Sequence, residues 1–183
     1  MIFLLRHDEV FSLGVNLTAR HESLEYDSFL SSNPDLDMLA ARPADERFIL
    51  CGGPVANGYG SPSFEEGVFK FTYKSEFVFL HNPVSSLPAA RPVGDIGFAA
   101  YSSTAAGDKF RDYVTCRPEH CHVILGYTGW NPGGLANEIE SGYWVPIDAT
   151  QELVFGTPPS RLWDACAAIA GIDKNSQPFG PQP

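Results

Sequence analysis

A glycine-rich turn with two aromatic residues is the strongest candidate for a binding site in this sequence. Residues 125–135 match the end of an apolar strand, a turn that contains Tyr127, Gly129 and Trp130, and the start of a helix. Backbone N–H groups at a helix start carry partial positive charge and can hold an anion, although Pro132 removes one donor. The aromatic rings could form the wall of a ligand pocket. The structural alternative is that the glycines only allow a strand and a helix to pack closely. The composition of the turn favours this alternative, and both stay open.

Cys51 and the segment 116–122 carry nucleophilic and metal-ligating side chains. Cys51 ends an apolar strand directly before a Gly-Gly pair, where a thiolate could act as a nucleophile or a redox switch. A buried, inert thiol is the more common role of a free cysteine. The segment 116–122 holds four potential zinc ligands, but it lacks the second spaced ligand pair of a structural zinc site. On a strand, His120 and His122 would face one side and Cys121 the other. The sequence therefore predicts no metal site.

Glu138 is the carboxylate that helix geometry places near the start of the helix, at residues 132–134, where it could line the same cleft. Glu140 is two residues further on and faces another direction, so the two carboxylates make a poor acid–base pair. A solvent-exposed Glu138 is the plainer alternative. The sequence contains no nucleophile triad order, phosphate-binding loop or dinucleotide fingerprint, and no cofactor is predicted.

Length and charge narrow the class of protein. A chain of 183 residues with 44% hydrophobic residues suits one domain with a sizeable core. A formal net charge of −10 argues against nucleic-acid binding, which depends on Lys and Arg contacts to phosphates. No apolar run is long enough for a membrane span, and the apolar start is too short for a signal peptide. We therefore expect a cytoplasmic protein, and its four cysteines do not suggest a disulfide scaffold.

The apolar patterning predicts more strands than helices. Strands are expected over about 2–6, 13–18, 47–51, 68–73, 77–81, 96–101, 122–127, 143–147 and 152–155, with 68–73 and 77–81 forming a hairpin. Four helical segments are expected: 23–41, which is interrupted and forms two short helices, 103 or 104 to 114, 132–141 and 160–170. In the third, Asn131 is the expected N-cap and Gly142 the expected stop. In the last, Leu162, Cys166 and Ile169 share one face. Residues 82–93 are rich in proline and are predicted to be irregular, and the tail 173–183 is predicted to be mobile. This balance favours an α+β fold with a mixed sheet.

The turn also carries a family signature. The run Leu125-Gly-Tyr-Thr-Gly-Trp130, followed by Gly134-Leu135, Glu138 and Trp144, resembles the signature of the AlgH/YqgE family of bacterial proteins. Upstream, Gly52-Gly53-Pro54-Val55 is similar to the Gly-Gly-Pro turn of that family. The resemblance covers roughly residues 4–172 in the right order.

This resemblance implies a single domain over residues 1–172, with a mixed β-sheet folded into a pseudo-barrel and helices packed outside. Members of the family are mostly uncharacterised, and the regulator label of some reflects a genetic association. The family usually has a further strand before the region that matches Ile2–His7, so we expect either that this chain starts late or that its start codon is misplaced. The chain carries an insertion between residues 58 and 77, and Gly134 and Ala136 stand where the family has Gln and Glu.

The sequence predicts a non-catalytic binding or regulatory module, with a small molecule or a protein as its ligand and a site between the two glycine turns. The predicted ligand-binding residues are Gly52, Gly53, Pro54, Tyr127, Gly129, Trp130, Gly134 and Glu138. The alternative is an enzyme of unassigned reaction that uses Cys51 or Glu138 in that cleft. A regulator that contacts DNA directly fits least, because of the acidic charge.

Overall fold

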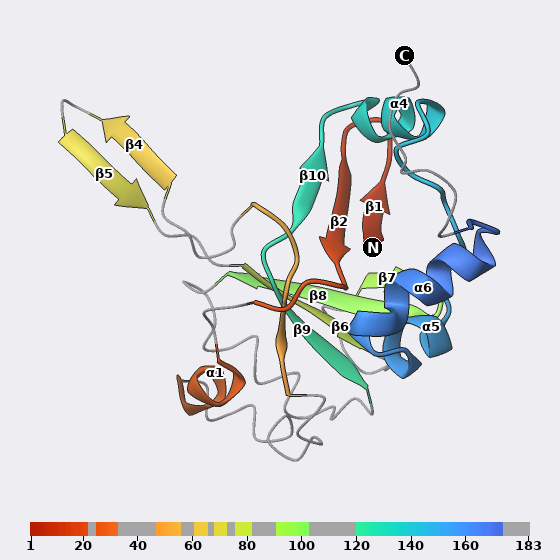
Figure 1. Ribbon diagram of the computed structural model, residues 1–183. Helices are drawn as coiled ribbons and strands as arrows, with labels where there is room; N and C mark the ends of the chain where they lie inside the picture. The colour runs from red at the N-terminus through yellow and green to blue at the C-terminus, as the bar shows by residue number, and fades with distance from the viewer. Residues whose placement is uncertain are drawn as a thin grey trace.

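In the computed structural model, the described residues form two β-sheets, a separate two-stranded hairpin and four helices (Figure 1). The structure describes residues 1–21, 25–32, 47–55, 61–65, 68–72, 76–81, 91–102 and 120–173.

The smaller sheet has three antiparallel strands in the order β1 (Ile2–His7), β2 (Ser12–Asn16) and β10 (Thr128–Trp130). The turn between β1 and β2 is closed by Asp8, whose Oδ1 accepts hydrogen bonds from two backbone N–H groups further along the turn. The first two strands confirm the prediction. The third was predicted as part of the turn, and it places Trp130 opposite Ser12 of β2.

The larger sheet has five strands in the order β3 (Ile49–Cys51), β9 (Cys121–Leu125), β6 (Glu76–His81), β8 (Ile96–Ser102) and β7 (Arg91–Val93). The pair β3 and β9 is parallel and the other pairs are antiparallel, so the predicted mixed sheet is confirmed.

One prediction about strand pairing and one about an irregular segment are wrong. The predicted hairpin of 68–73 with 77–81 does not form, because β6 pairs with β8 and β9 instead. Residues 78–80 are all buried, which suits a central strand covered on both faces. The hairpin is made by β4 (Ser61–Glu65), a strand that was not predicted, and β5 (Val68–Thr72). Within the proline-rich segment, Arg91–Val93 is regular, since Pro92 is tolerated on an edge strand.

The helices are α1 (Tyr26–Ser32), α4 (Gly134–Glu140), α5 (Gln151–Gly156) and α6 (Pro159–Ile169). Helix α4 starts later than predicted, because Gly133 has φ 75° and serves as the N-cap. The prediction of Asn131 as the N-cap is therefore wrong, although Asn131 O accepts a hydrogen bond from Gly134 N at 2.9 Å. Gly142, with φ 79°, follows the helix as predicted.

The strands predicted over 143–147 and 152–155 are also wrong. Residues 143–150 have no regular structure, and helix α5 begins after Thr150. The hydroxyl of Thr150 accepts a hydrogen bond from Leu153 N at 3.1 Å, and this N-cap favours the helix over a strand. In α6, Leu162 and Cys166 are buried as expected and Ala167 is buried beside them, but Ile169 is 60% exposed, so its prediction is wrong.

Three other predictions fall on residues outside the described ranges. They are the second helix piece after residue 33, the helix from 103 or 104 to 114, and nearly all of the tail 173–183.

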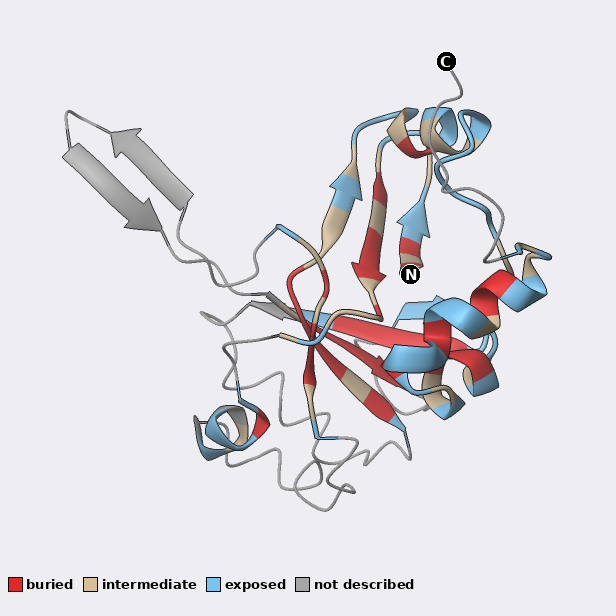
Figure 2. Cartoon of the chain, viewed as in Figure 1, coloured by how far each residue is buried: buried red, intermediate tan, exposed pale blue. Residues whose placement is uncertain are grey.

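The core lies between the two sheets and the C-terminal helices (Figure 2). The two sheets, α5 and α6 all contribute to one apolar cluster: Phe3, Leu5, Val15, Leu17, Leu50, Val78, Leu80, Ile96, Phe98, Ile124, Leu153, Val154, Leu162 and Cys166. The predicted α+β class is confirmed, with one correction. The strands divide into two sheets that do not close into a pseudo-barrel, although Asn16 N donates to Gly52 O at 2.9 Å where the sheets meet.

Candidate functional site

The two glycine turns are in direct backbone contact. Val55 and Tyr127 exchange two hydrogen bonds of 3.0 Å between their main chains. A Cβ atom at Gly52 would lie 2.1 Å from Gly126 O, and one at Gly53 would lie 2.4 Å from Tyr127 O. Side chains at both positions are therefore sterically excluded, so these glycines allow the main chains to approach each other.

Cys51 lies half-buried at the end of β3, directly before this contact, while Pro54 is exposed. The prediction that the two glycine turns lie next to each other is therefore confirmed. A ligand-binding role for Gly52, Gly53 and Pro54 stays a prediction, as does a reactive Cys51 thiol.

The other predicted residues meet in a different contact, which we call the tryptophan cluster: Trp130, Glu138 and Trp144. Glu138 Oε2 accepts hydrogen bonds from Trp130 Nε1 at 2.8 Å and from Trp144 Nε1 at 2.5 Å. The two indole rings stand edge to face, with their centroids 6.2 Å apart. The cluster ties β10, α4 and the segment after α4 together. It also gives a physical reason for the spacing of the signature, which the sequence alone did not provide.

An apolar cavity of about 450 Å³ lies beside the tryptophan cluster. Its walls come from β1, α4, the segment 143–149, α5 and α6. Apolar side chains dominate the lining, among them Phe3, Leu17, Leu135, Ile139, Leu153 and Leu162. The chain has three tryptophans, and all of them line this cavity: Trp130, Trp144 and Trp163.

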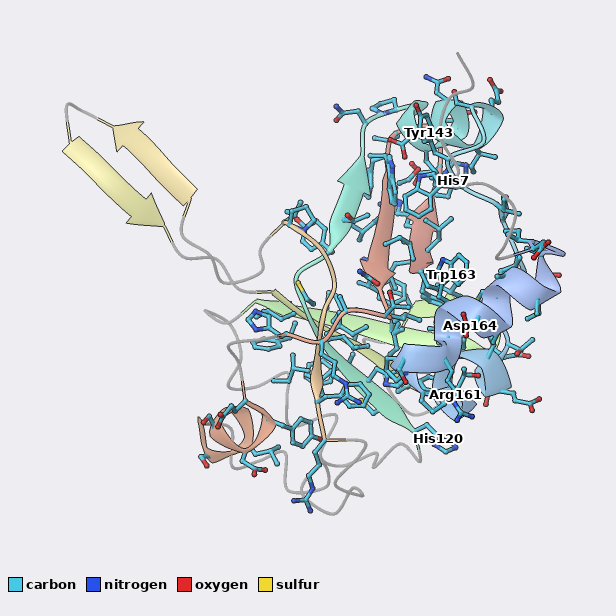
Figure 3. The ribbon with its side chains drawn as sticks, viewed as in Figure 1. His7, His120, Tyr143, Arg161, Trp163 and Asp164 are labelled. Atoms are coloured by element: carbon cyan, nitrogen blue, oxygen red, sulfur yellow. The ribbon has the colours of Figure 1, made fainter. Side chains whose placement is uncertain are left out.

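Several lining residues remain accessible from outside. Tyr143 is 52% exposed, Val145 47% and Trp163 47%. Figure 3 labels two of them, with Tyr143 next to α4 and Trp163 on α6. Sequence reasoning missed this part of the site because it assigned 143–147 to a strand. The signals for it were the three apolar residues at 143–145 and the place of Trp144 in the family signature.

Electrostatics inside the cavity suit an uncharged ligand. Burial raises the pKa of the Cys166 thiol above its usual range, so this lining residue is a neutral thiol at neutral pH. Asp148 is the one acidic residue of the lining, and it is exposed. Met1 also lines the cavity; its α-amino group donates to Thr18 Oγ1 at 3.3 Å, and burial lowers the pKa of this group. The wall therefore offers an apolar surface with one carboxylate at its accessible side and one partly buried amino group.

A second, more open hollow of about 520 Å³ lies against Trp130, Tyr127, Gly129 and Asn131. Ser12 also lines it, and its hydroxyl is hydrogen-bonded to His7 Nδ1 at 2.7 Å. Three of the predicted site residues therefore lie together here, and Trp130 contributes to both hollows.

The histidines after residue 119 have structural contacts. The His120 and His122 rings both stack against Phe155, at centroid distances of 5.9 and 5.3 Å, whereas Cys121 is 1% exposed. The predicted alternation of faces is thus confirmed. No group of three or more His, Cys, Asp or Glu side chains suited to a metal ion occurs among the described residues, and Cys116 lies outside them.

In the part of the chain that the structure describes, no helix has both the length and the hydrophobicity to cross a bilayer.

Comparisons with known proteins agree on one family. A family model described as AlgH-like matches residues 1–175. The chain is 26% identical over 180 residues to a UPF0301 protein of Proteus mirabilis, and the match covers 94% of this chain and 82% of that protein. It is 28% identical over 174 residues to a UPF0301 protein of Nitrosococcus oceani, and the match covers 93% of this chain and 79% of that protein.

Two solved structures share the fold. The solution structure of the AlgH protein from Pseudomonas aeruginosa superimposes with a TM-score of 0.60 at 24% identity, covering 98% of this chain and 84% of that one. The crystal structure of protein DIP2367 from Corynebacterium diphtheriae gives a TM-score of 0.59 at 17% identity, and the superposition covers 91% of this chain and 75% of that one. At these identities the likeness concerns the fold alone.

Proposed function

This chain belongs to the AlgH-like family, and we propose that it is a non-catalytic binding module that holds an apolar ligand in the cavity beside the tryptophan cluster. One observation carries the proposal: an accessible cavity of about 450 Å³ with mainly apolar walls and three tryptophans around it. Ligand sites typically measure about 300–1,000 Å³, with apolar and aromatic walls and few polar groups.

The state of Glu138 supports binding over catalysis. Two indole N–H groups donate to the same Oε2 atom, so the carboxylate already serves as a hydrogen-bond acceptor that holds two side chains in place. Both indole donors use Oε2, so they fix the direction of the carboxylate, and Oε1 is the oxygen whose lone pairs these two bonds do not use. Glu138 therefore fits a positioning role at the edge of the cavity better than the acid–base role of the enzyme alternative, in which the carboxylate must be aimed at the substrate.

The charge near the cavity supports a ligand other than nucleic acid. Among residues 134–173, which supply most of the cavity wall, six are acidic and one is basic. Of these, Asp148 lines the cavity, and the net charge of −10 over the whole chain also works against the binding of phosphate groups. An apolar ligand without negative charge is the chemistry that this wall accommodates.

A thermal-shift screen of uncharged apolar metabolites tests the proposal, followed by titration of tryptophan emission. A compound at about 100 times its Kd adds about 2.7 kcal/mol to the stability. For a chain of this size this raises the melting temperature by about 5–10 °C. Since every tryptophan lines the cavity, the emission should change over the same concentration range.

Two variants locate the site. Trp163→Ala removes part of the wall, and Ala149→Phe narrows the cavity from its exposed side. Val10→Ala is the matched control, because Val10 is 63% exposed and does not line the cavity. The proposal predicts that both cavity variants lose the ligand-induced shift while the control keeps it. An equal shift in all of them, or no shift with any compound, would contradict it.

A further inference from the structure

We propose that residues 143–149, which we call the strap, control access to the cavity, and that the hydrogen bond between Trp144 and Glu138 latches the strap closed. Ligands enter and leave the cavity when this latch opens. The inference rests on the proposed function, because it names how access to the same site is regulated.

The strap is a thin outer wall of the cavity. All seven of its residues line the cavity, and all of them except Ile147 are exposed. The strap therefore has the cavity on one side and water on the other. Other parts of the wall differ, because Phe3, Leu153 and Leu162 belong to the buried core. Movement of the strap would therefore open the cavity and leave the core in place.

Hydrogen bonds hold the main chain of the strap at its ends. The strap has no regular structure, and in Figure 1 it is part of the loop that connects α4 with α5. At one end Tyr143 N donates to Glu138 O at 2.9 Å, and beyond the other end Thr150 caps α5. Within the described part of the chain, the main chain of residues 144–149 makes no hydrogen bond. Exposed segments with few backbone hydrogen bonds open locally at a small cost in free energy.

Two side chains of the strap hold it against the rest of the protein. Trp144 Nε1 donates to Glu138 Oε2 at 2.5 Å, and the same oxygen accepts from Trp130 Nε1 at 2.8 Å. Ile147 is half-buried and packs against the core. The apolar contact of Ile147 has no preferred direction, whereas the bond of Trp144 has a defined geometry and breaks when the strap moves. The indole N–H of Trp144 is therefore the latch.

The thiol of Cys166 reports opening of the strap without any ligand. Cys166 lines the cavity from α6 and is 4% exposed, so an uncharged thiol reagent such as N-ethylmaleimide reaches it through the cavity. Cys121 in β9 is 1% exposed and does not line the cavity, so its alkylation reports opening of the larger sheet. Mass spectrometry of the digested protein measures the alkylation rate of each cysteine, and the two rates distinguish movement of the strap from unfolding.

Trp144→Phe removes the latch and keeps an aromatic ring in the strap. We expect Cys166 to react about fivefold faster in this variant than in the wild type, the equivalent of about 1 kcal/mol for a partly exposed bond to a charged acceptor. The Cys121 rate should stay unchanged. Tyr143→Phe is the matched control on the same strap, because the Tyr143 hydroxyl makes no hydrogen bond to the described residues, and both rates should stay at the wild-type value.

Two results of this experiment would overturn the proposal. One is an equal Cys166 rate in Trp144→Phe and Tyr143→Phe, which would mean that the indole N–H does not hold the strap. The other is a Cys121 rate that rises in step with the Cys166 rate, which would mean that the substitution loosens the whole fold and not the strap.

Stopped-flow mixing with dansyl amide, a neutral apolar fluorophore, tests the effect of the latch on ligand exchange. Entry and exit both pass the open strap, so Trp144→Phe should raise the association and dissociation rate constants together, each about fivefold. Val10→Ala should change neither, because Val10 does not line the cavity. A rise in the dissociation rate constant alone would identify Trp144 as a mere contact of the bound ligand and would refute the gating role.

Failure of this inference is distinguishable from failure of the proposed function. If dansyl amide binds the cavity but Trp144→Phe leaves the Cys166 rate unchanged, the strap proposal fails and the proposed function stands. If the Cys166 rate rises as expected but no apolar compound binds, the strap proposal stands and the proposed function fails. If neither result is obtained, both fail.

Discussion

Removal of the Glu138 carboxylate should loosen the contact that joins β10, α4 and the segment after α4. In Glu138→Ala, two indole N–H groups lose their acceptor. A hydrogen bond to a charged group contributes about 1.5–3 kcal/mol when it is shielded from water. Trp144 is 37% exposed and Glu138 is half-buried, so water replaces part of each bond. We therefore expect a loss of about 2 kcal/mol in the free energy of unfolding, below the roughly 3 kcal/mol that two fully shielded bonds would give at the low end.

Thermal and urea denaturation, monitored by tryptophan emission and by circular dichroism, measure this loss. For a chain of 150–250 residues, a loss of about 2 kcal/mol lowers the melting temperature by about 4–8 °C. Glu140→Ala is the matched control on the same helix, because Glu140 is exposed, and it should change stability by less than about 0.5 kcal/mol. Glu138→Gln keeps an oxygen acceptor without the charge and should lose about half as much as Glu138→Ala.

A double-mutant cycle separates the two bonds. In a Trp144→Phe background one donor is absent, so Glu138→Ala should cost about 1 kcal/mol less than it does in the wild type. The reasoning is refuted if Glu138→Ala and Glu140→Ala are equally stable, or if the cost of Glu138→Ala is unchanged in the Trp144→Phe background.

Three further predictions follow from single contacts. Gly52→Ala should destabilise the protein by about 3 kcal/mol in urea denaturation, because its Cβ would lie 2.1 Å from Gly126 O, whereas Gly134→Ala, with no atom closer than 3.5 Å, should be neutral. Thr150→Ala should cost about 1 kcal/mol, because α5 loses its N-cap; an unchanged melting temperature would contradict this. Hydrogen bonds from two backbone N–H groups and an arginine hold the pKa of Asp8 below its usual range. Their contribution is therefore present above the unfolded pKa of about 3.9 and is lost as pH falls through the folded value, so the stability difference between wild type and Asp8→Asn should shrink below about pH 4.

The local pattern of apolar residues and glycines was sufficient to predict some elements correctly. The apolar run at 121–125 became a buried strand, and Gly142 ended a helix as expected. The pattern failed over 152–155, where a short apolar run fits a strand or a helix equally well. There the cap at Thr150 and the burial of Leu153 and Val154 against α6 decide for the helix.

For a similar reason, the sequence predicted individual residues of the candidate site but not their contacts or the cavity. The residues Trp130 and Glu138 were identified from their types and from the family signature. Their hydrogen bond with each other, and with Trp144, depends on how β10, α4 and the following segment converge. The cavity depends on tertiary structure even more, because β1 at one end of the chain and α6 at the other form its opposite walls.

An NMR titration of the nitrogen-15-labelled protein with dansyl amide, a neutral apolar fluorophore, decides whether the cavity beside the tryptophan cluster is the binding site. The three indole N–H signals belong to Trp130, Trp144 and Trp163, which all line the cavity. All three signals should shift together and saturate, while the backbone amide signals of Gly52 and Gly126 should stay unchanged. Shifts centred on the Gly52–Pro54 turn, with the indole signals unmoved, would contradict it.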